Sequence, residues 1–312
     1  MILRTNTVAT SFEVNHGRVT RLLAVDRHTG TQLSFAADHF VVASGALATP
    51  HLLLTAGVQR LNPAGEHVGR HLMRHCNGIV IGASSLPSGE SQEFRKQIGV
   101  HDFYLGDPAA ADVTGRLGAI QQVRATQIAL LMAPLPRSVK AALSPILERM
   151  VGFIVIAEDQ PRSENRVHLD LRRKDNFGRP VARVHHRHTL RDFAARRALS
   201  ARSEEILREA GCAFTLRVPV GTFSHGLGTV RMGEDPTRFP VAPDGRFRGT
   251  DNLWITDGSV FPTSAAVNPS LSISANALRV AAQIVAGAAR PVPARATLVR
   301  KTATWSRRRS EV

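Results

Sequence analysis

The feature that most restricts how this chain can fold is a set of three short motifs in its last third. The first is a run at 224–233 that holds one histidine among several glycines, the second spans 257–263, and the third is Asn268-Pro269. Glycine has no Cβ and tolerates positive φ, so a dense group of glycines lets the backbone approach other groups closely. We therefore expect a fold in which loops from distant parts of the sequence meet.

The composition predicts a globular protein large enough for two domains. The chain has 312 residues, of which 43% are apolar, and both values are ordinary for folded proteins. No apolar run approaches the ~18 residues of a membrane-spanning helix, so we expect no membrane span. Only Cys76 and Cys212 are present, which argues against a disulfide framework and makes the reducing cytoplasm the default compartment.

Arginine supplies almost all of the net charge of +15. A basic balance can mark a nucleic-acid partner, but the arginines are scattered and no aromatic stacking platform accompanies them. We expect no nucleic-acid partner, and a basic nucleic-acid-binding scaffold stays as a rival hypothesis on the charge alone. Residues 291–312 are basic and unpatterned, and we expect a disordered tail there.

Hydrophobic periodicity and turn residues predict a mixed α/β chain. We expect strands over residues 8–14, 18–26, 31–35, 39–43, 78–83, 121–132, 154–157, 166–171, 181–185 and 253–256. We expect helices over 51–56, 139–150, 190–210 and 268–288. Thr49 and Pro50 have the residue types of a helix start, and Thr189 with Asp192 forms the pattern of a capping box.

The distribution of these elements predicts two domains, one of them assembled from both ends of the chain. Residues 1–76 and 223–290 hold the glycine-rich turns and the short apolar strands. Residues 77–222 hold mixed strands and one long amphipathic helix. We assign the first set to one domain and the second to an inserted domain made of an antiparallel sheet and a helix.

Three groups of residues in the motifs are suited to chemistry or ligand binding. His225 can accept a proton near neutral pH. Asp257-Gly258 follows a short apolar strand, where α/β sheets place ligand contacts. Asn268 before Pro269 is typical of a helix start, whose free N–H groups attract negative charge. Each group also has an ordinary structural interpretation: a loop histidine, a tight turn and a plain capped helix.

Taken together, the motifs resemble those of a known family. The order of the C-terminal motifs is similar to the signature of the glucose-methanol-choline (GMC) oxidoreductases: His225, Gly228-Thr229, Met232-Gly233, Asp257-Gly258-Ser259, Pro262-Thr263 and Asn268-Pro269. Upstream, residues 41–54 resemble the family's second flavin-contacting segment, and 68–75 resembles its next landmark. The likeness is close over residues 39–76 and 222–288 and loose over 160–211.

The resemblance implies an FAD-dependent oxidoreductase that acts on the CH–OH group of an alcohol, sugar or polyol. His225 would accept the hydroxyl proton while hydride passes to flavin N5, and Asn268 would hydrogen-bond the alcohol oxygen. The domain at 77–222 would shape the substrate pocket. The positions that match the family's FAD contacts are Gly45, Asp257, Gly258, Asn268 and Pro269.

The glycine loop with which family members hold the FAD pyrophosphate has no match in this chain. No G-x-G-x-x-G run occurs in the sequence, and the run starting at Gly226 has Arg231 in place of the third glycine. We therefore expect an incomplete Rossmann-like FAD-binding domain, unpaired apolar strand edges and weak FAD binding.

A missing glycine loop suggests a truncated chain, with export left open, or a second polypeptide that supplies the N-terminal part. The partners to look for are that polypeptide and an electron acceptor. The rival hypothesis is a non-catalytic fragment that cannot retain FAD by itself.

Two further clusters predict no site of their own. Glu158-Asp159 and Asp170 have no partner at a diagnostic spacing, so we expect a solvated acidic surface. At 185–188, neighbouring strand residues would point to opposite faces, and an arginine between the histidines opposes a cation. We therefore expect no metal.

Overall fold

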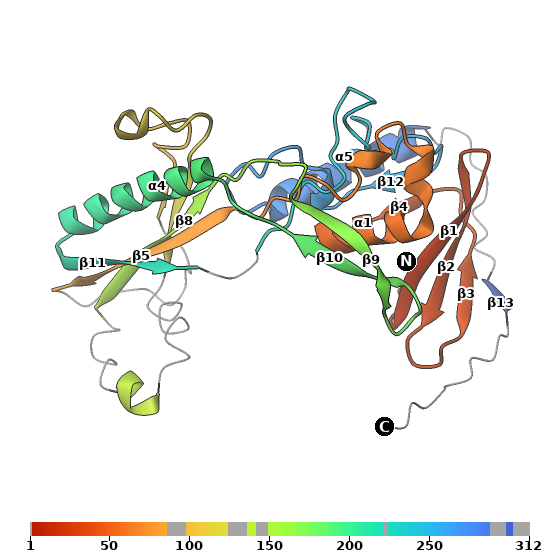
Figure 1. Ribbon diagram of the computed structural model, residues 1–312, viewed down its shortest axis with the longest axis horizontal. Helices are drawn as coiled ribbons and strands as arrows, with labels where there is room; N and C mark the ends of the chain where they lie inside the picture. Colours follow the sequence, from red (N-terminus) through yellow and green to blue (C-terminus); the bar gives the residue numbers. More distant parts are fainter. Residues whose placement is uncertain are drawn as a thin grey trace.

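The computed structural model describes residues 2–85, 98–123, 136–141, 149–220, 224–287 and 298–301. They form two lobes joined by a narrow waist (Figure 1). The first lobe holds helices α1 (Gly45–Ala56) and α5 (Ser270–Gly287), and the second holds α4 (Leu190–Glu209). Both lobes also contain sheets, so the predicted mixed α/β fold is confirmed.

A four-stranded sheet forms one side of the first lobe, in the order β1-β2-β3-β13. β1 (Thr7–Asn15) and β2 (Arg18–Asp26) form the predicted hairpin, and β3 (Gln32–Phe35) continues it. β13 (Leu298–Lys301) pairs antiparallel with β3. These four residues of the expected disordered tail therefore form a strand, and the rest of the tail lies outside the described residues.

The core of the first lobe lies around a short parallel pair of strands. β4 (Phe40–Val42) pairs with β12 (Leu253–Ile255) in parallel, which joins segments from the two ends of the chain. Buried apolar side chains from both ends pack into one cluster there, including Phe12, Phe40, Leu53, Phe247 and Ile255. Val41 on β4 is 52% exposed, and the expected unpaired strand edges stay a prediction.

Helix α1 begins six residues before the predicted range of 51–56. It starts at Gly45, so Pro50 lies inside it and Thr49 is not its capping residue. Pro50 has no N–H to give to the Ala46 carbonyl. The Thr229 hydroxyl donates to that carbonyl at 2.7 Å instead. Gly57 ends the helix with φ 74°, as its sequence position predicts.

The second lobe is an antiparallel five-stranded sheet with α4 packed on one face (Figure 1). The strands, in sheet order, are β11 (Cys212–Pro219), β5 (Cys76–Ser84), β8 (Met150–Ala157), β7 (Gly118–Val123) and β6 (Gly99–Val100). The strand predicted over 121–132 is observed as far as Val123, and the remainder lies outside the described residues. Most of the helix predicted over 139–150 lies outside them too, and Met150 belongs to β8.

Helix α4 begins as the sequence predicts. The Thr189 side chain accepts the Asp192 N–H, and the Asp192 side chain accepts the Thr189 N–H, which completes the capping box. The helix ends before Gly211, which has φ 86°. Local sequence alone therefore sets both ends of this helix.

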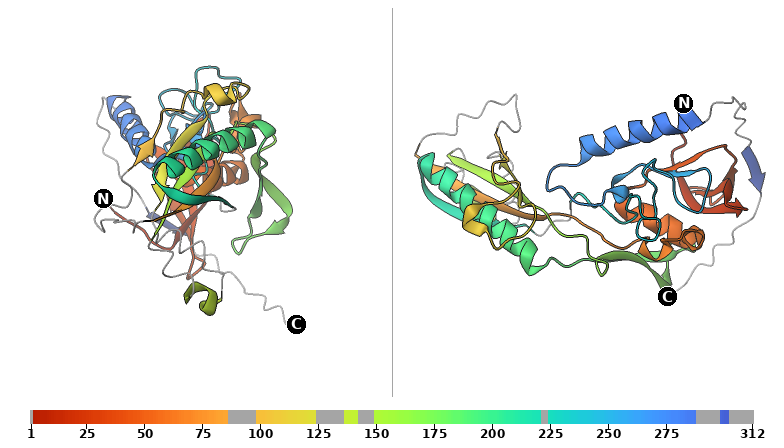
Figure 2. Two further views of the ribbon diagram at one scale, coloured as in Figure 1. Left: turned by 90° about the vertical axis from the view of Figure 1, so that its left-hand side faces the viewer. Right: turned by 90° about the horizontal axis from the view of Figure 1, so that it is seen from above.

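The hairpin of β9 (Arg166–Lys174) and β10 (Pro180–His185) packs against α1. The Val167 N–H donates to the Gly69 carbonyl at 2.7 Å, and a His51 ring nitrogen lies 2.7 Å from the Pro180 carbonyl. Seen from above, the hairpin and α5 lie on opposite sides of α1 (Figure 2). The domain boundaries at 77 and 222 stay predictions.

Helix α5 is largely exposed. Only Asn276 and Val280 on it are buried, whereas Leu271 is 85% and Leu278 74% exposed. Within the part of the chain that is described, no helix has the length and apolarity to cross a membrane. The described residues also include four 3₁₀ helices: Val58–Leu61, Gly65–His67, Pro108–Ala110 and Gly258–Val260.

Candidate active site

Two histidines from distant segments face each other where the two lobes meet. Met73 and Leu227 exchange backbone hydrogen bonds of 3.0 and 2.9 Å. In an antiparallel bridge, the residue two positions after one partner lies opposite the residue two positions before the other. His75 therefore lies opposite His225, and their ring centroids are 5.2 Å apart in an edge-to-face arrangement.

His75 is held as a neutral, buried imidazole. Its side chain is 1% exposed, its backbone has φ 62°, and neither ring nitrogen has a hydrogen-bond partner of normal geometry among the described residues. The Val267 carbonyl lies close enough to favour a proton on the ring, but burial outweighs it and lowers the pKa of His75 to about 4. At neutral pH this ring therefore carries no charge beside His225.

Asn268 lies near the same junction. Its side-chain amide donates to the Gln121 side chain on β7 at 2.9 Å, which connects the start of α5 to the second lobe. The residue before it, Val267, faces His75 through its carbonyl. His75 thus lies between His225 and the segment that carries Asn268. The sequence predicts Asn268 as the capping residue directly before the helix. Helix α5 begins at Ser270, so Pro269 is the residue directly before it and Asn268 lies one position further away.

Asp257 fixes the amino end of α1. One carboxylate oxygen accepts the Gly45 N–H at 3.0 Å and the Thr49 hydroxyl at 2.5 Å, and the other accepts the Ser259 N–H at 2.8 Å. Both oxygens are therefore bonded within the protein. The structure brings Asp257 and Gly45 together as the sequence motifs suggest, with Asp257 acting on the helix end.

Gly258 and Gly228 allow the loops of the site to pack closely. A Cβ at Gly258 would lie 2.9 Å from the Leu227 side chain, and one at Gly228, where φ is 83°, would lie 2.7 Å from the His71 carbonyl. The Gly228 N–H donates to the Gly258 carbonyl at 3.1 Å. These two glycines are required because two stretches of backbone meet there.

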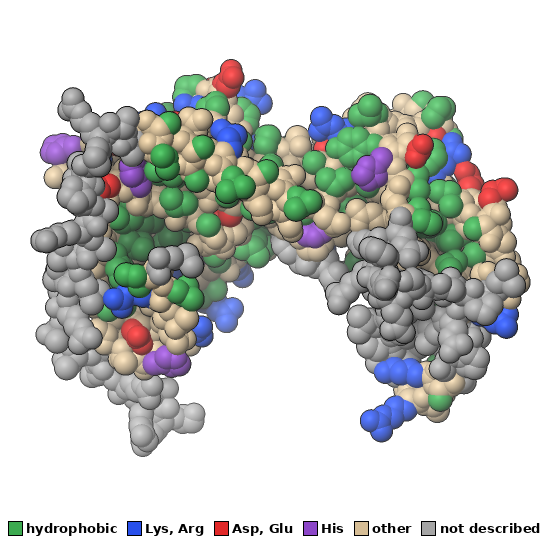
Figure 3. All heavy atoms as spheres, turned by 180° about the vertical axis from the view of Figure 1, so that it is seen from behind, with side chains coloured by type: hydrophobic (Ala, Val, Ile, Leu, Met, Phe, Trp, Pro, Cys, Tyr) green, Lys and Arg blue, Asp and Glu red, His purple; other side chains and the backbone are tan. Residues whose placement is uncertain are grey.

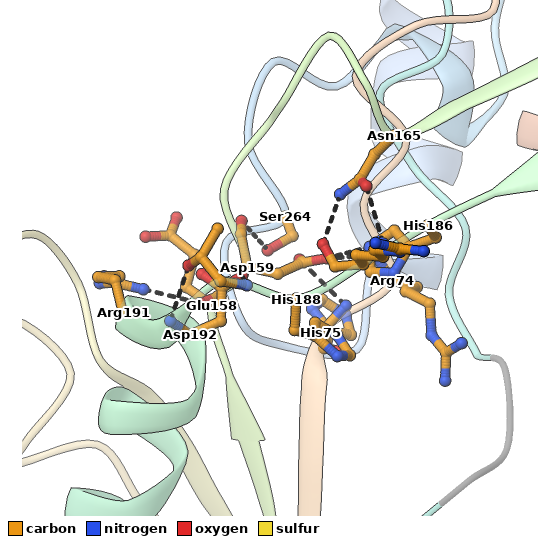
Figure 4. A network of polar contacts seen from close by, with 12 residues as sticks. Arg74, His75, Glu158, Asp159, Asn165, His186, His188, Arg191, Asp192 and Ser264 are labelled. Carbon is orange, nitrogen blue, oxygen red and sulfur yellow. Dashed lines mark hydrogen bonds and ion pairs between the residues drawn. The ribbon is translucent and has the colours of Figure 1, made fainter.

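Behind the histidine pair lies a buried polar network centred on Asp159 (Figure 4). Asp159 is 1% and Glu158 5% exposed, so the expected solvated acidic surface is wrong. The Asp159 carboxylate accepts the N–H groups of Arg74 and His75 at 2.8 and 3.1 Å. Burial acts to raise the pKa of Asp159, but the hydrogen bonds from His186 and Arg74 outweigh it and hold the pKa below its usual range.

The histidines that follow β10 belong to the same network. One ring nitrogen of His186 lies 3.2 Å from Asp159, and one of His188 lies 3.0 Å from the His75 carbonyl. The donor atoms of these two histidines and Asp159 lie within 4.8 Å of one another. Each of the three already has a hydrogen-bond partner in the protein, and the absence of a metal stays a prediction.

The amino end of α1 borders open space. Gly45 has φ 84°, and a Cβ there would meet nothing within 4 Å, so open space lies in front of it. The Ser44 side chain makes no capping hydrogen bond. The Gly45 N–H already donates to Asp257, so only the later N–H groups of the first turn could favour an anionic or carbonyl group of a ligand. Of the residues predicted to contact FAD, Gly45 and Asn268 reach the surface, whereas Asp257, Gly258 and Pro269 are buried.

Comparison with known proteins agrees with this arrangement. Two family models match the chain, both described as GMC oxidoreductase, one over residues 2–77 and the other over 161–277. The chain belongs to the GMC oxidoreductase family. The matched ranges contain His75, His225 and Asn268.

Curated relatives extend the match over most of the chain. It is 28% identical over 296 residues to a 2-methyl-1,2-propanediol dehydrogenase of Mycolicibacterium austroafricanum, covering 89% of this chain and 53% of that protein. It is 30% identical over 300 residues to a 6'''-hydroxyparomomycin C oxidase of Streptomyces lividus, covering 90% and 51%. The chain therefore spans about half the length of the curated relatives it matches.

A solved structure supports the fold. An Aspergillus oryzae formate oxidase variant, studied for FAD modification, superposes with a TM-score of 0.66 at 15% identity, covering 91% of this chain and 60% of that one. At this identity the likeness shows the fold, and it agrees with the predicted α/β architecture.

Sequence reasoning missed His75 and Asp159. The first belongs to the 68–75 motif that resembles a family landmark, but nothing in the sequence gives its register against 225–227. The second lies in an acidic pair without diagnostic spacing. The apolar residues at 72–73 and 227, each close to a histidine, are the local signal that could have suggested a buried bridge.

Proposed function

We propose that this chain provides the proton acceptor and the substrate-facing part of an FAD-dependent oxidoreductase that acts on a CH–OH group. The observation that carries the proposal is the neutral His75 ring packed against His225. A charged neighbour would make His225 a weaker base. Because His75 is uncharged at neutral pH, this ring places no positive charge beside His225 that would oppose a proton there.

In the proposed reaction, a ring nitrogen of His225 accepts the hydroxyl proton and Asn268 orients the alcohol oxygen. FAD, when bound, supplies the acceptor for the hydride. Gly45 at the start of α1 and Asn268-Pro269 before α5 would hold the flavin, with Asp257 fixing α1 and Gly258 allowing the loops to pack. A hollow opens between the two lobes on one side of the waist (Figure 3).

The proposed substrate is a small alcohol, a sugar or a polyol. The names of the relatives support a CH–OH substrate, since they include a diol dehydrogenase and a C-glycoside 3-oxidase. Those names agree on the kind of group that is oxidised and differ in the molecule that carries it. We therefore propose one reaction type, oxidation of a CH–OH group, and a range of substrate molecules.

The test is an absorbance spectrum of the purified chain after incubation with FAD and removal of the excess. A retained flavin band that bleaches anaerobically with a panel of alcohols, sugars and polyols would support the proposal. A chain that unfolds cooperatively but retains no flavin would favour the rival function, a non-catalytic fragment. A retained flavin that no CH–OH compound reduces would contradict the proposed reaction.

A further inference from the structure

The backbone around His75 is held by one buried carboxylate. His75 has a positive φ of 62°, a conformation that is unfavourable for a residue with a side chain. The two oxygens of Asp159 accept the N–H groups of Arg74 and His75, one each. A carboxylate that accepts two successive N–H groups fixes the direction of both peptides. The position of the His75 ring therefore depends on Asp159.

The same residue also reaches the segment that leads to Asn268. The Ser264 hydroxyl lies 3.4 Å from the Asp159 carbonyl oxygen, to which it donates. The two residues that follow, Ala265 and Ala266, both have positive φ, at 53° and 49°. The Tyr104 hydroxyl donates to the Ala265 carbonyl at 2.9 Å. Hydrogen bonds to Asp159 and from Tyr104 thus hold this turn against the second lobe. Because Asn268 follows the turn closely in the sequence, the turn fixes the position of Asn268.

A third contact holds the carboxylate itself. His186 lies 3.2 Å from one Asp159 oxygen, and both side chains are almost fully buried, at 5% and 1% exposure. Asn165 in turn accepts the Arg187 N–H at 2.8 Å and donates to the Arg187 carbonyl at 3.1 Å. The segment that carries His186 is therefore fixed by its own hydrogen bonds (Figure 4), and His186 contacts the Asp159 oxygen that also accepts the Arg74 N–H.

We propose that Asp159 is a positioning residue that aligns the two sides of the active site, with His75 and His225 on one side and the Asn268 segment on the other. Its carboxylate is buried and bonded to groups within the protein. The role rests on the proposed function of His225 and Asn268, but the geometry that it controls exists without flavin. The test can therefore be made on the flavin-free chain.

The experiment compares Asp159→Asn with Glu158→Gln. The amide of the first variant keeps the shape but presents an NH₂ group where an oxygen accepted an N–H. Glu158 is the matched control, since it is the neighbouring buried carboxylate and lies 3.9 Å from Arg116, in an ion pair that does not involve His75. The measurement is the two-dimensional NMR spectrum of the histidine ring C–H groups, assigned with His75→Gln and His225→Gln.

The expected result is that the ring signals of His75 and His225 move by more than a linewidth in Asp159→Asn and stay in place in Glu158→Gln. Unmoved signals in an Asp159→Asn chain that still melts cooperatively would overturn the proposal. If Asp159→Asn does not fold, His186→Leu removes the lateral contact alone. That variant should move the same two signals, and unmoved signals there would overturn the proposal equally.

A second readout uses the flavin-loaded protein. A displaced base slows the chemical step by about 10²-fold for a misplacement on the order of 1 Å. Asp159→Asn should therefore lower kcat by about that factor, with KM changed far less and flavin retained. A rise in KM alone would contradict positioning. The NMR experiment needs no flavin. If the proposed oxidoreductase function is wrong, the NMR experiment still tests the positioning role of Asp159, so the two failures can be told apart.

Discussion

The two lobes hold their chains together in different ways. In the first lobe the decisive contacts join distant residues, as when Asp257 accepts the Gly45 N–H. In the second lobe, antiparallel strands form a regular ladder and α4 carries its own capping box. The candidate site is held together mainly by contacts between residues that are distant in the sequence, as in the first lobe. We therefore expect matched changes in the two lobes to have unequal effects.

Acid should loosen the first lobe before the second. Burial lowers the pKa of His71 and His75 from 6.5 to about 4. Between those values the unfolded chain binds protons that the folded chain excludes. The stability from these two groups is complete above pH 6.5 and falls by up to about 1.4 kcal/mol per pH unit for each as the pH drops.

The second lobe contains groups with the opposite sign. Burial raises the pKa of Glu158 and of Asp192, so the folded state takes up these protons more readily and gains stability as the pH falls. Hydrogen exchange from pH 7 to pH 4.5, corrected for intrinsic rates, should show protection lost first around α1 and β12. Earlier loss in the five-stranded sheet would contradict this assignment.

Two glycines with the same backbone conformation test the role of close packing. Gly228 and Gly211 have φ of 83° and 86°, but a Cβ added at Gly211 would meet nothing within 4 Å, whereas one at Gly228 would meet the Met73 side chain and the His71 carbonyl. Gly228→Ala should cost about 2–5 kcal/mol, from strain and overpacking, and Gly211→Ala about 1–2 from strain alone. Chemical denaturation measures both, and equal costs would show that the loops can separate without penalty.

Two hydroxyl groups that donate to helix carbonyls give a smaller contrast. Thr229 bonds the Ala46 carbonyl at 2.7 Å, and Ser203 bonds the Leu199 carbonyl at 2.8 Å. Pro50 leaves the first carbonyl without its helical donor, whereas the second has one. Thr229→Val should therefore cost about 1–3 kcal/mol, and Ser203→Ala less than about 1. If thermal melts show similar losses, the Pro50 argument is wrong.

The same contrast explains what the sequence could predict. The capping box at Thr189 and the hairpin around residues 15–17 are local patterns, and the structure has both. The sequence misplaces the start of α1 because Thr49 and Pro50 have the residue types of a helix start. Their actual environment, an Asp257 carboxylate and a Thr229 hydroxyl, comes from more than 150 residues away, at separations of 208 and 183.

The candidate site divides in the same way. His225, Asn268, Gly45 and Asp257 lie in motifs that the sequence displays as a set. His75 and Asp159 could not be assigned, because their roles depend on the pairing of Met73 with Leu227 and on two N–H groups that point at one buried carboxylate. Pairing between distant loops has no periodic signal in a single sequence.

The most direct test of the central claim is the rate of anaerobic flavin reduction by substrate in flavin-loaded His225→Ala. The matched control is His28→Ala, an exposed histidine in the turn after β2. Loss of the proton acceptor should slow reduction by about 10²–10⁴-fold without loss of flavin, and the control should match the unaltered protein. A His225→Ala protein that reduces its flavin at the unaltered rate would contradict the account.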